Sequence, residues 1–162
     1  MGINPGNEST WLMKGLVLFK QESYDEALLC CCKALEIKQE NNMDALILEG
    51  CILNGLKRYK ETIQCCNKAL KIDSKDVDLF RLKATTLLSL GRYDEALQNC
   101  NKALEIDSKD VDLWNAKGIA LIGLRRYDEA LKCNNKALEI EPENRSACKV
   151  KGLILDSIKN KE

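Results

Sequence analysis

One segment occurs four times along this chain. Its clearest copy reads Gly91-Arg92-Tyr93-Asp94-Glu95-Ala96-Leu97 and ends in Lys102-Ala103-Leu104-Glu105-Ile106. The copy at Tyr127 follows 34 residues later, the copy at Tyr59 lies 34 residues earlier, and the copy at Tyr24 lies 35 residues before that. All four tyrosines of the protein occupy this one position. A fixed period of this length is typical of stacked supersecondary units, so we predict an all-α helical repeat protein.

The composition excludes several classes of partner. The chain has 162 residues, and its 25 basic residues balance its 25 acidic ones. A neutral chain has no overall field that would attract nucleic acid or an anionic membrane. No apolar run is long enough to cross a bilayer, and no signal-peptide pattern opens the chain. We therefore expect a cytoplasmic protein with no nucleic-acid and no membrane partner, in which residues 1–7 form a flexible N-terminal lead-in.

Each copy contains two segments with helical periodicity, separated by a short break. The four copies are residues 8–42, 43–76, 77–110 and 111–144. Residues 145–160 repeat only the first helix, and we interpret them as the terminal cap that a stack of repeats needs. Residues 8–160 would then form a single domain. The residue before each first helix can accept a hydrogen bond from an unpaired backbone N–H. These predicted caps are Asn7, Asn42, Asp76, Asp110 and Asn144.

The fourth copy carries a recognisable pattern: Trp114-x-x-x-Gly118, then Tyr127, Ala130, Ala137 and Pro142. It resembles the tetratricopeptide repeat, a family of 34-residue helix-turn-helix units. The resemblance implies a right-handed superhelical solenoid of four repeats plus a C-terminal capping helix. It also implies a scaffold that is not an enzyme, needs no cofactor and binds peptides or helices of other proteins in a concave groove. The positions where this chain departs from the usual Leu of the family are Lys14, Glu49, Lys83 and Lys117.

The resemblance places the groove on one side of the first helices. The residues carried over from the family are Leu12, Leu16, Phe19, Ile47, Cys51, Asn54, Arg81, Thr85, Leu88, Asn115, Ile119 and Ile122. One branch of the family grips ligand carboxylates with Lys, Asn and Arg at such places, and here only Arg81 is left of that set. We therefore predict a mostly apolar groove that takes an apolar peptide or an amphipathic helix of a protein partner.

Three aspartates form the predicted edge of this groove: Asp44, Asp78 and Asp112. They could pair with basic residues of a ligand, or they could only favour the first turn of each helix. For the apolar groove the rival interpretation is self-association, in which another copy of the chain fills the groove or packs on the terminal helix.

Nine cysteines raise metal or redox chemistry as a further alternative. An odd count without the spacing of a secreted disulfide framework indicates reduced thiols. Neighbours such as Cys30-Cys31-Cys32 and Cys65-Cys66 point about 100° apart on a helix and do not converge on one ion. The chain has no histidine to complete a mixed zinc site. We interpret the thiols as packing groups without a metal, apart from Cys51, which we expect to be exposed in the groove.

Overall fold

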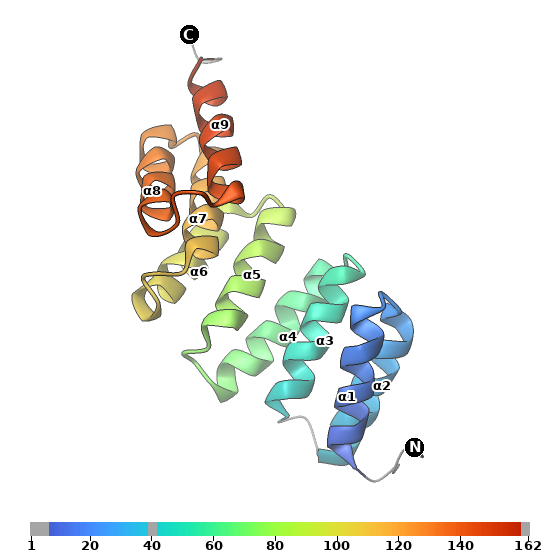
Figure 1. The fold of residues 1–162 in the computed structure, drawn as a ribbon. Coiled ribbons are helices and arrows are strands. Elements are labelled where there is room, and N and C mark those ends of the chain that lie inside the picture. Colours follow the sequence, from blue (N-terminus) through green and yellow to red (C-terminus); the bar gives the residue numbers. More distant parts are fainter. Residues whose placement is uncertain (1–6, 39–41, 160–162) are drawn as a thin grey trace. The chain divides into compact units, whose positions relative to one another are not determined.

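The computed structural model describes residues 7–38 and 42–159, and its regular structure over these ranges is entirely helical. Residues 1–6 of the predicted lead-in lie outside the described residues. The helices are α1 (Glu8–Lys20), α2 (Tyr24–Lys38), α3 (Met43–Gly55), α4 (Tyr59–Ile72), α5 (Val77–Ser89), α6 (Tyr93–Ile106), α7 (Val111–Gly123), α8 (Tyr127–Ile140) and α9 (Arg145–Lys159) (Figure 1). In the described part of the chain, none of them combines the length and apolarity needed to cross a membrane. The predicted all-α repeat fold is confirmed.

The predicted N-caps fix where each first helix begins. Asn7 Oδ1 accepts a hydrogen bond from the Ser9 N–H over 3.0 Å. Asp110 Oδ1 accepts one from the Leu113 N–H over 2.9 Å. The remaining caps make the same kind of bond, and they are Asn42, Asp76 and Asn144. One such cap contributes about 1 kcal/mol to stability. All five predicted caps are confirmed.

The first helix of each pair ends in a turn with one residue in the left-handed region. The φ values are 60° at Glu22, 59° at Lys57, 70° at Gly91 and 59° at Arg125. After Gly91 the Arg92 N–H donates to a carbonyl of the last helical turn over 3.0 Å, which closes the end of α5. Glycine adopts this conformation without steric penalty, so the other three turns hold a strained side-chain-bearing residue at the same place.

The chain forms two compact units, and the boundary between them lies between Ser74 and Lys75. Unit 1 contains α1 to α4, and unit 2 contains α5 to α9. Within each unit every helix packs on the next one in the chain. First helices also pack directly on one another: α1 on α3 in unit 1, and α5 on α7 and α7 on α9 in unit 2 (Figure 1). A single domain over residues 8–160 stays a prediction.

Small residues let the helices of unit 1 approach closely. Ala27, Cys31 and Ala34 are fully buried on one face of α2, as their spacing of four and three residues predicts. Ala27 and Cys31 pack with Ile52 of α3, and Leu18 and Phe19 of α1 pack against the same cluster.

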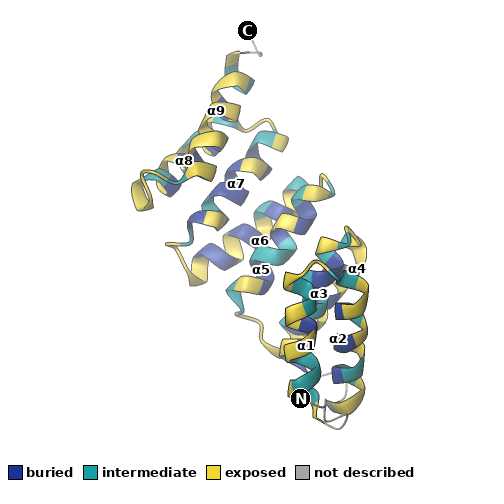
Figure 2. Cartoon of the chain, turned by 45° about the vertical axis from the view of Figure 1, so that its right-hand side comes forward, coloured by how far each residue is buried: buried dark blue, intermediate teal, exposed yellow. Residues whose placement is uncertain are grey.

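In unit 2 the equivalent core joins three helices. Leu121 of α7 packs with Ala130 and Cys133 of α8 and with Val150 and Ile154 of α9. Figure 2 shows α7 as a largely buried helix, since it has neighbours on several sides. The last helix therefore covers α7, which is the role expected of a terminal cap.

Two of the repeated tyrosines, Tyr24 and Tyr93, pack against a glycine at the end of the following first helix. A Cβ added to Gly55 would lie 2.8 Å from Cε1 of Tyr24, and one added to Gly123 would lie 2.5 Å from Cγ of Tyr93. The ring thus fills the space that a larger side chain would need. These tyrosines are packing residues, so the repeated segment around them builds the scaffold.

Candidate ligand-binding groove

A pocket of about 450 Å³ opens between α1 and α3 of unit 1. Residues three or four apart on a helix share one face, and the facing sides of these two neighbouring helices supply its walls. The lining residues are Ser9, Leu12, Met13, Leu16, Phe19, Asp44, Ile47, Leu48 and Cys51. The pocket thus brings together all the predicted groove and edge residues of unit 1 except Asn54. Whether these residues bind a ligand stays a prediction.

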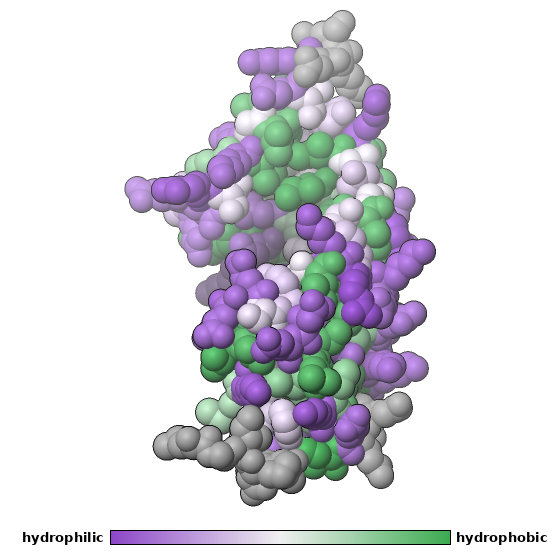
Figure 3. Space-filling model, turned by 90° about the vertical axis from the view of Figure 1, so that its right-hand side faces the viewer, coloured by the Kyte–Doolittle hydropathy of each residue, from purple (hydrophilic) through white to green (hydrophobic). Residues whose placement is uncertain are grey.

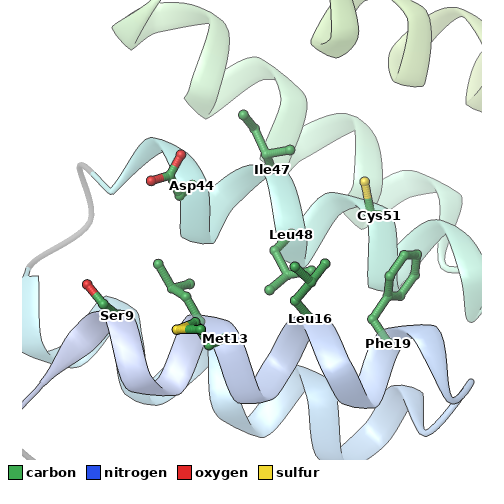
Figure 4. A pocket seen from close by; sticks show the side chains of 9 residues that line it. Ser9, Met13, Leu16, Phe19, Asp44, Ile47, Leu48 and Cys51 are labelled. Carbon is green, nitrogen blue, oxygen red and sulfur yellow. The ribbon is translucent and has the colours of Figure 1, made fainter.

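The pocket has one polar end and an apolar body. Ser9 and Asp44 lie at one end, and Phe19 and Cys51 lie at the other (Figure 4). None of the lining residues is basic. At the polar end the N-cap of α3 is held to α1, because Asn42 Nδ2 donates a hydrogen bond to Glu8 Oε1. This bond helps to fix the spacing of the two helices that form the walls.

Part of the pocket wall is open to solvent. The side chain of Met13 is 71% exposed and that of Leu16 is 45% exposed. Figure 3 shows apolar surface exposed among hydrophilic side chains on one side of the molecule. An apolar hollow of this kind would lose its contact with water if a ligand covered it, and that loss is favourable.

The predicted groove residue Arg81 is engaged inside unit 2. It stands at the repeat position of Leu12 and Ile47. Its Nη1 donates to Asp110 Oδ2 over 2.5 Å, and its Nη2 donates to Asp78 Oδ1. Asp110 is also the N-cap of α7. Arg81 therefore stabilises the start of the next first helix, and Asp78, predicted for the groove edge, is paired with it.

Asn115 occupies the same repeat position one copy later. It is only 5% exposed, so it is not open to a ligand as the groove prediction requires. Its Nδ2 donates to Asn144 Oδ1 over 3.4 Å. Asn144 caps α9 through the Ala147 N–H. A polar residue at this position therefore bonds to the following cap, whereas an apolar residue here lines the pocket of unit 1.

Over the ranges that the structure describes, the pockets found in unit 2 are not lined by the other predicted residues of that unit. Thr85 is exposed, and its hydroxyl donates to carbonyl groups of its own helix. Leu88 and Ile122 are half-buried and pack against the core clusters. Ile119 is 38% exposed. Asp112 is exposed in the first turn of α7. The apolar hollow described above is thus lined by residues of unit 1, and a groove function of the unit 2 residues stays a prediction.

Three lining residues of the pocket were not predicted: Ser9, Met13 and Leu48. Met13 and Leu48 stand at one repeat position, next to the predicted Leu12 and Ile47. Ser9 lies one helical turn before Met13. The spacing of four residues from Ser9 to Met13 is a signal that could have identified this second edge of the α1 face.

The thiols mostly pack inside the units. Six cysteines are buried, Cys51 is half-buried in the pocket, and Cys32 and Cys148 are exposed. Burial raises the pKa of Cys31, Cys65 and Cys100 to about 12. In the described residues no group of three Cys, Asp or Glu side chains is placed to hold a metal ion. Burial of six thiols agrees with their interpretation as packing groups, and the expectation that they hold no metal stays a prediction.

Comparison with known proteins agrees with this architecture. A family model described as tetratricopeptide repeat matches residues 87–150, and one described as anaphase-promoting complex, cyclosome, subunit 3 matches residues 20–103. The chain belongs to the tetratricopeptide repeat family. As a member it has the architecture of a protein-interaction scaffold. None of the curated proteins compared with it matches.

Solved structures of tetratricopeptide repeat proteins share this fold. YrrB, described as having an unusual peptide-binding site, aligns with a TM-score of 0.81 at 24% identity, over 92% of this chain and 76% of its own. A repeat protein from Parabacteroides merdae aligns with a TM-score of 0.86 at 19% identity, over 96% of this chain and 60% of its own. The repeat domain of Arabidopsis OM64 aligns with a TM-score of 0.67 at 26% identity, over 69% and 93%.

Proposed function

We propose that this protein is a non-catalytic interaction scaffold whose unit 1 pocket receives apolar side chains from a peptide or amphipathic helix of a protein partner. The observation that carries the proposal is the pocket of about 450 Å³ between α1 and α3, with its exposed apolar wall. Isolated exposed apolar residues are common, but a contiguous apolar hollow usually marks a binding surface. A cytoplasmic location stays a prediction.

The apolar wall would supply most of the affinity. Burying one Leu- or Phe-sized ligand side chain contributes about 1.5–3 kcal/mol, or about ten- to a hundredfold in affinity. Met13 and Leu16 would be covered at the same time, which removes further apolar surface from water. The peptide-binding site described for YrrB supports a peptide as the class of ligand.

Asp44 would set the direction of the ligand. It lies at the polar end of the pocket, and among the described residues its carboxylate forms no ion pair. A basic ligand residue beside it would gain at most about 1 kcal/mol, because an exposed ion pair is weak. We therefore assign orientation to Asp44 and affinity to the apolar wall. Of the three aspartates predicted for the groove edge, the proposal thus uses Asp44 alone.

A displayed library of random peptides, selected against the purified chain, tests the proposal. We expect enriched peptides with two or more bulky apolar residues and a basic residue at one end. Leu16→Asp should weaken their binding at least tenfold, because it places a charge on the pocket wall. Ile119→Asp is the matched control, since Ile119 has the same repeat position and a similar exposure in unit 2. Equal loss in both variants, or in neither, would refute the assignment.

Self-association is the second candidate, and two exposed apolar residues of α9 favour it. Leu153 is 56% exposed and Leu155 is 43% exposed. A Cβ added to Gly152 would meet no atom within 4 Å, whereas Gly118 at the same repeat position lies against Val150. Sedimentation equilibrium distinguishes the candidates: a dimer that dissociates in the double variant Leu153→Glu, Leu155→Glu supports self-association, and a monomer at all concentrations excludes it.

A further inference from the structure

Unit 2 contains a second hollow, on a different set of helices from the proposed peptide groove. It has a volume of about 270 Å³ and is lined by residues of α6, α7 and α8, and we call it the α6–α8 crevice. Figure 1 shows these three helices next to one another. Leu97 and Leu121 form part of its wall. Its charged lining residues are Lys117, Arg126, Glu129 and Lys132.

Two of the cations in this crevice are not neutralised. Arg126 donates from Nε and Nη2 to the two carboxylate oxygens of Glu129, each over 2.7 Å. The positive charge of Arg126 is therefore balanced by the negative charge of Glu129. Among the described residues, no ion pair is recorded for Lys117 or Lys132. The ammonium of Lys117 lies 5.1 Å from the ring centroid of Trp114, which leaves its charge in place.

Glu129 is the carboxylate among the lining residues of the crevice, and its ion pair with Arg126 dominates its electrostatics. The hydrogen bond from Arg126 lowers the pKa of Glu129, and the charges of Arg126, Lys132 and Lys117 act in the same direction. Lys117 comes from α7 and Lys132 from α8, so two helices direct their cations at one place. Lys117 is also one of the positions where Leu is usual in the family.

The repeat itself supplies a matched comparison in unit 1. The position of Lys117 is taken there by Glu49, and that of Lys132 by Gln64. The Arg–Glu pair is retained as Arg58 and Glu61, joined by bonds of 2.8 and 2.6 Å. Glu49 accepts a hydrogen bond from the Cys65 thiol over 3.4 Å. The same scaffold thus carries one carboxylate in unit 1 and two unpaired ammonium groups in unit 2.

We propose that the α6–α8 crevice binds a phosphate monoester. Such a group carries a charge of about −1.5 to −2 near pH 7, which matches two unpaired cations better than a single carboxylate does. Lysine ammonium groups bind phosphate oxygens as point charges and donate to them. Leu97 and Leu121 would contact the carbon body that bears the phosphate. Phosphodiesters carry only one negative charge and fit the crevice less well.

Phenyl phosphate is the probe that tests this site on the full chain. In a ¹⁵N–¹H NMR titration at pH 7.5 and low salt, we expect saturable shifts of the amides around Lys117 and Lys132. Benzenesulfonate has the same ring with one negative charge and should bind at least threefold more weakly. Shifts confined to other helices, or equal affinity for the two probes, would overturn the proposal.

Two variants test the lysines by replacing them with the residues found at the equivalent positions of unit 1, Glu49 and Gln64. The double variant Lys117→Glu, Lys132→Gln should weaken phenyl phosphate binding at least tenfold. Lys132→Gln alone changes only an exposed side chain, so it should fold as the parent does and weaken binding severalfold. Unchanged affinity in a folded Lys132→Gln protein would refute the assignment.

A second probe, a glycine-flanked phosphoserine pentapeptide, distinguishes the kind of molecule that carries the phosphate. Tighter binding of the pentapeptide than of phenyl phosphate, with shifts at the same amides, would support a phosphorylated side chain of a partner protein. The reverse order, again with shifts at the same amides, would support a small aromatic monoester. The α6–α8 crevice is independent of the unit 1 pocket, so Leu16→Asp should leave both affinities unchanged.

Discussion

Replacement of Gly123 by alanine tests the packing of a repeated tyrosine, Tyr93, against the next first helix. Gly123 is the last residue of α7, and the ring of Tyr93 lies directly over its α-carbon. An added Cβ would lie 2.5 Å from Cγ and 2.6 Å from both Cδ atoms of that ring. Carbon atoms in ordinary contact lie about 3.5–4.0 Å apart, so the ring or the helix end must move by about 1 Å.

Two opposing contributions decide whether Gly123→Ala raises or lowers the free energy of unfolding. Overpacking a filled site costs about 1–3 kcal/mol. Alanine gains at most about 1 kcal/mol over glycine inside a helix, and less at a helix end. We therefore expect Gly123→Ala to lower the free energy of unfolding by about 1–2 kcal/mol, which corresponds to about 2–8 °C in Tm. Gly152→Ala is the matched control: it lies inside α9 with no atom within 4 Å, and it should gain up to about 1 kcal/mol.

Urea denaturation followed by far-UV circular dichroism measures both variants against the parent. The Tyr93→Leu background provides a second check, because removing the ring should abolish most of the cost of Gly123→Ala. If Gly123→Ala is as stable as Gly152→Ala in the parent background, the ring does not fill the site and the reasoning is wrong.

Three further predictions use the same denaturation assay. Gly91→Ala should cost about 1 kcal/mol or more because φ is 70°, whereas Arg125→Gly should stabilise by up to about 1 kcal/mol because φ is 59°. Asp110→Ala should cost about 2–3 kcal/mol, since it removes a cap and one of the two carboxylates that pair with the half-buried Arg81 guanidinium. Asp76→Ala, which removes only a cap, should cost about 1 kcal/mol. Burial raises the pKa of Cys100 from 9.0 to about 12, so the folded protein retains a proton that the unfolded chain loses above pH 9. Stability should therefore fall between pH 9 and about 12, and less steeply in Cys100→Ala.

Local chemistry explains why the repeat and its helix boundaries could be predicted from sequence. The cap residues act on backbone groups two or three positions away, so the sequence around Asn7 or Asp110 contains the whole interaction. The small residues of α2 lie on one face because of helical spacing alone. Such features need no knowledge of a neighbouring repeat.

The extent of the groove depends on contacts between repeats, and there the sequence was a weaker guide. Arg81 and Asn115 share a repeat position with Leu12 and Ile47, which lined them up with the groove. Each of them instead forms a hydrogen bond with the N-cap residue of the following first helix, which lies 29 residues further along the chain. Polarity at that position, rather than position alone, separates a capping partner from a pocket wall.

The charged residues at the usual Leu position are a second case. Lys117 and Glu49 differ in sign at equivalent positions, which is visible in the sequence. The contacts of each one depend on the adjacent second helices. Glu49 accepts a hydrogen bond from the Cys65 thiol, and Lys117 lines a crevice together with further cations. The consequence of this departure from the family therefore needed the packed helices.

The central claim is that unit 1 holds the peptide site between α1 and α3. Its most direct test is a ¹⁵N–¹H NMR titration of the chain with a library-selected peptide, followed by intermolecular NOEs from ligand methyl or aromatic protons. We predict NOEs to the Met13 methyl group and to the methyl groups of Leu16 and Ile47, with amide shifts along α1 and α3. NOEs and shifts confined to unit 2, with Met13 and Leu16 unperturbed at saturation, would contradict the account.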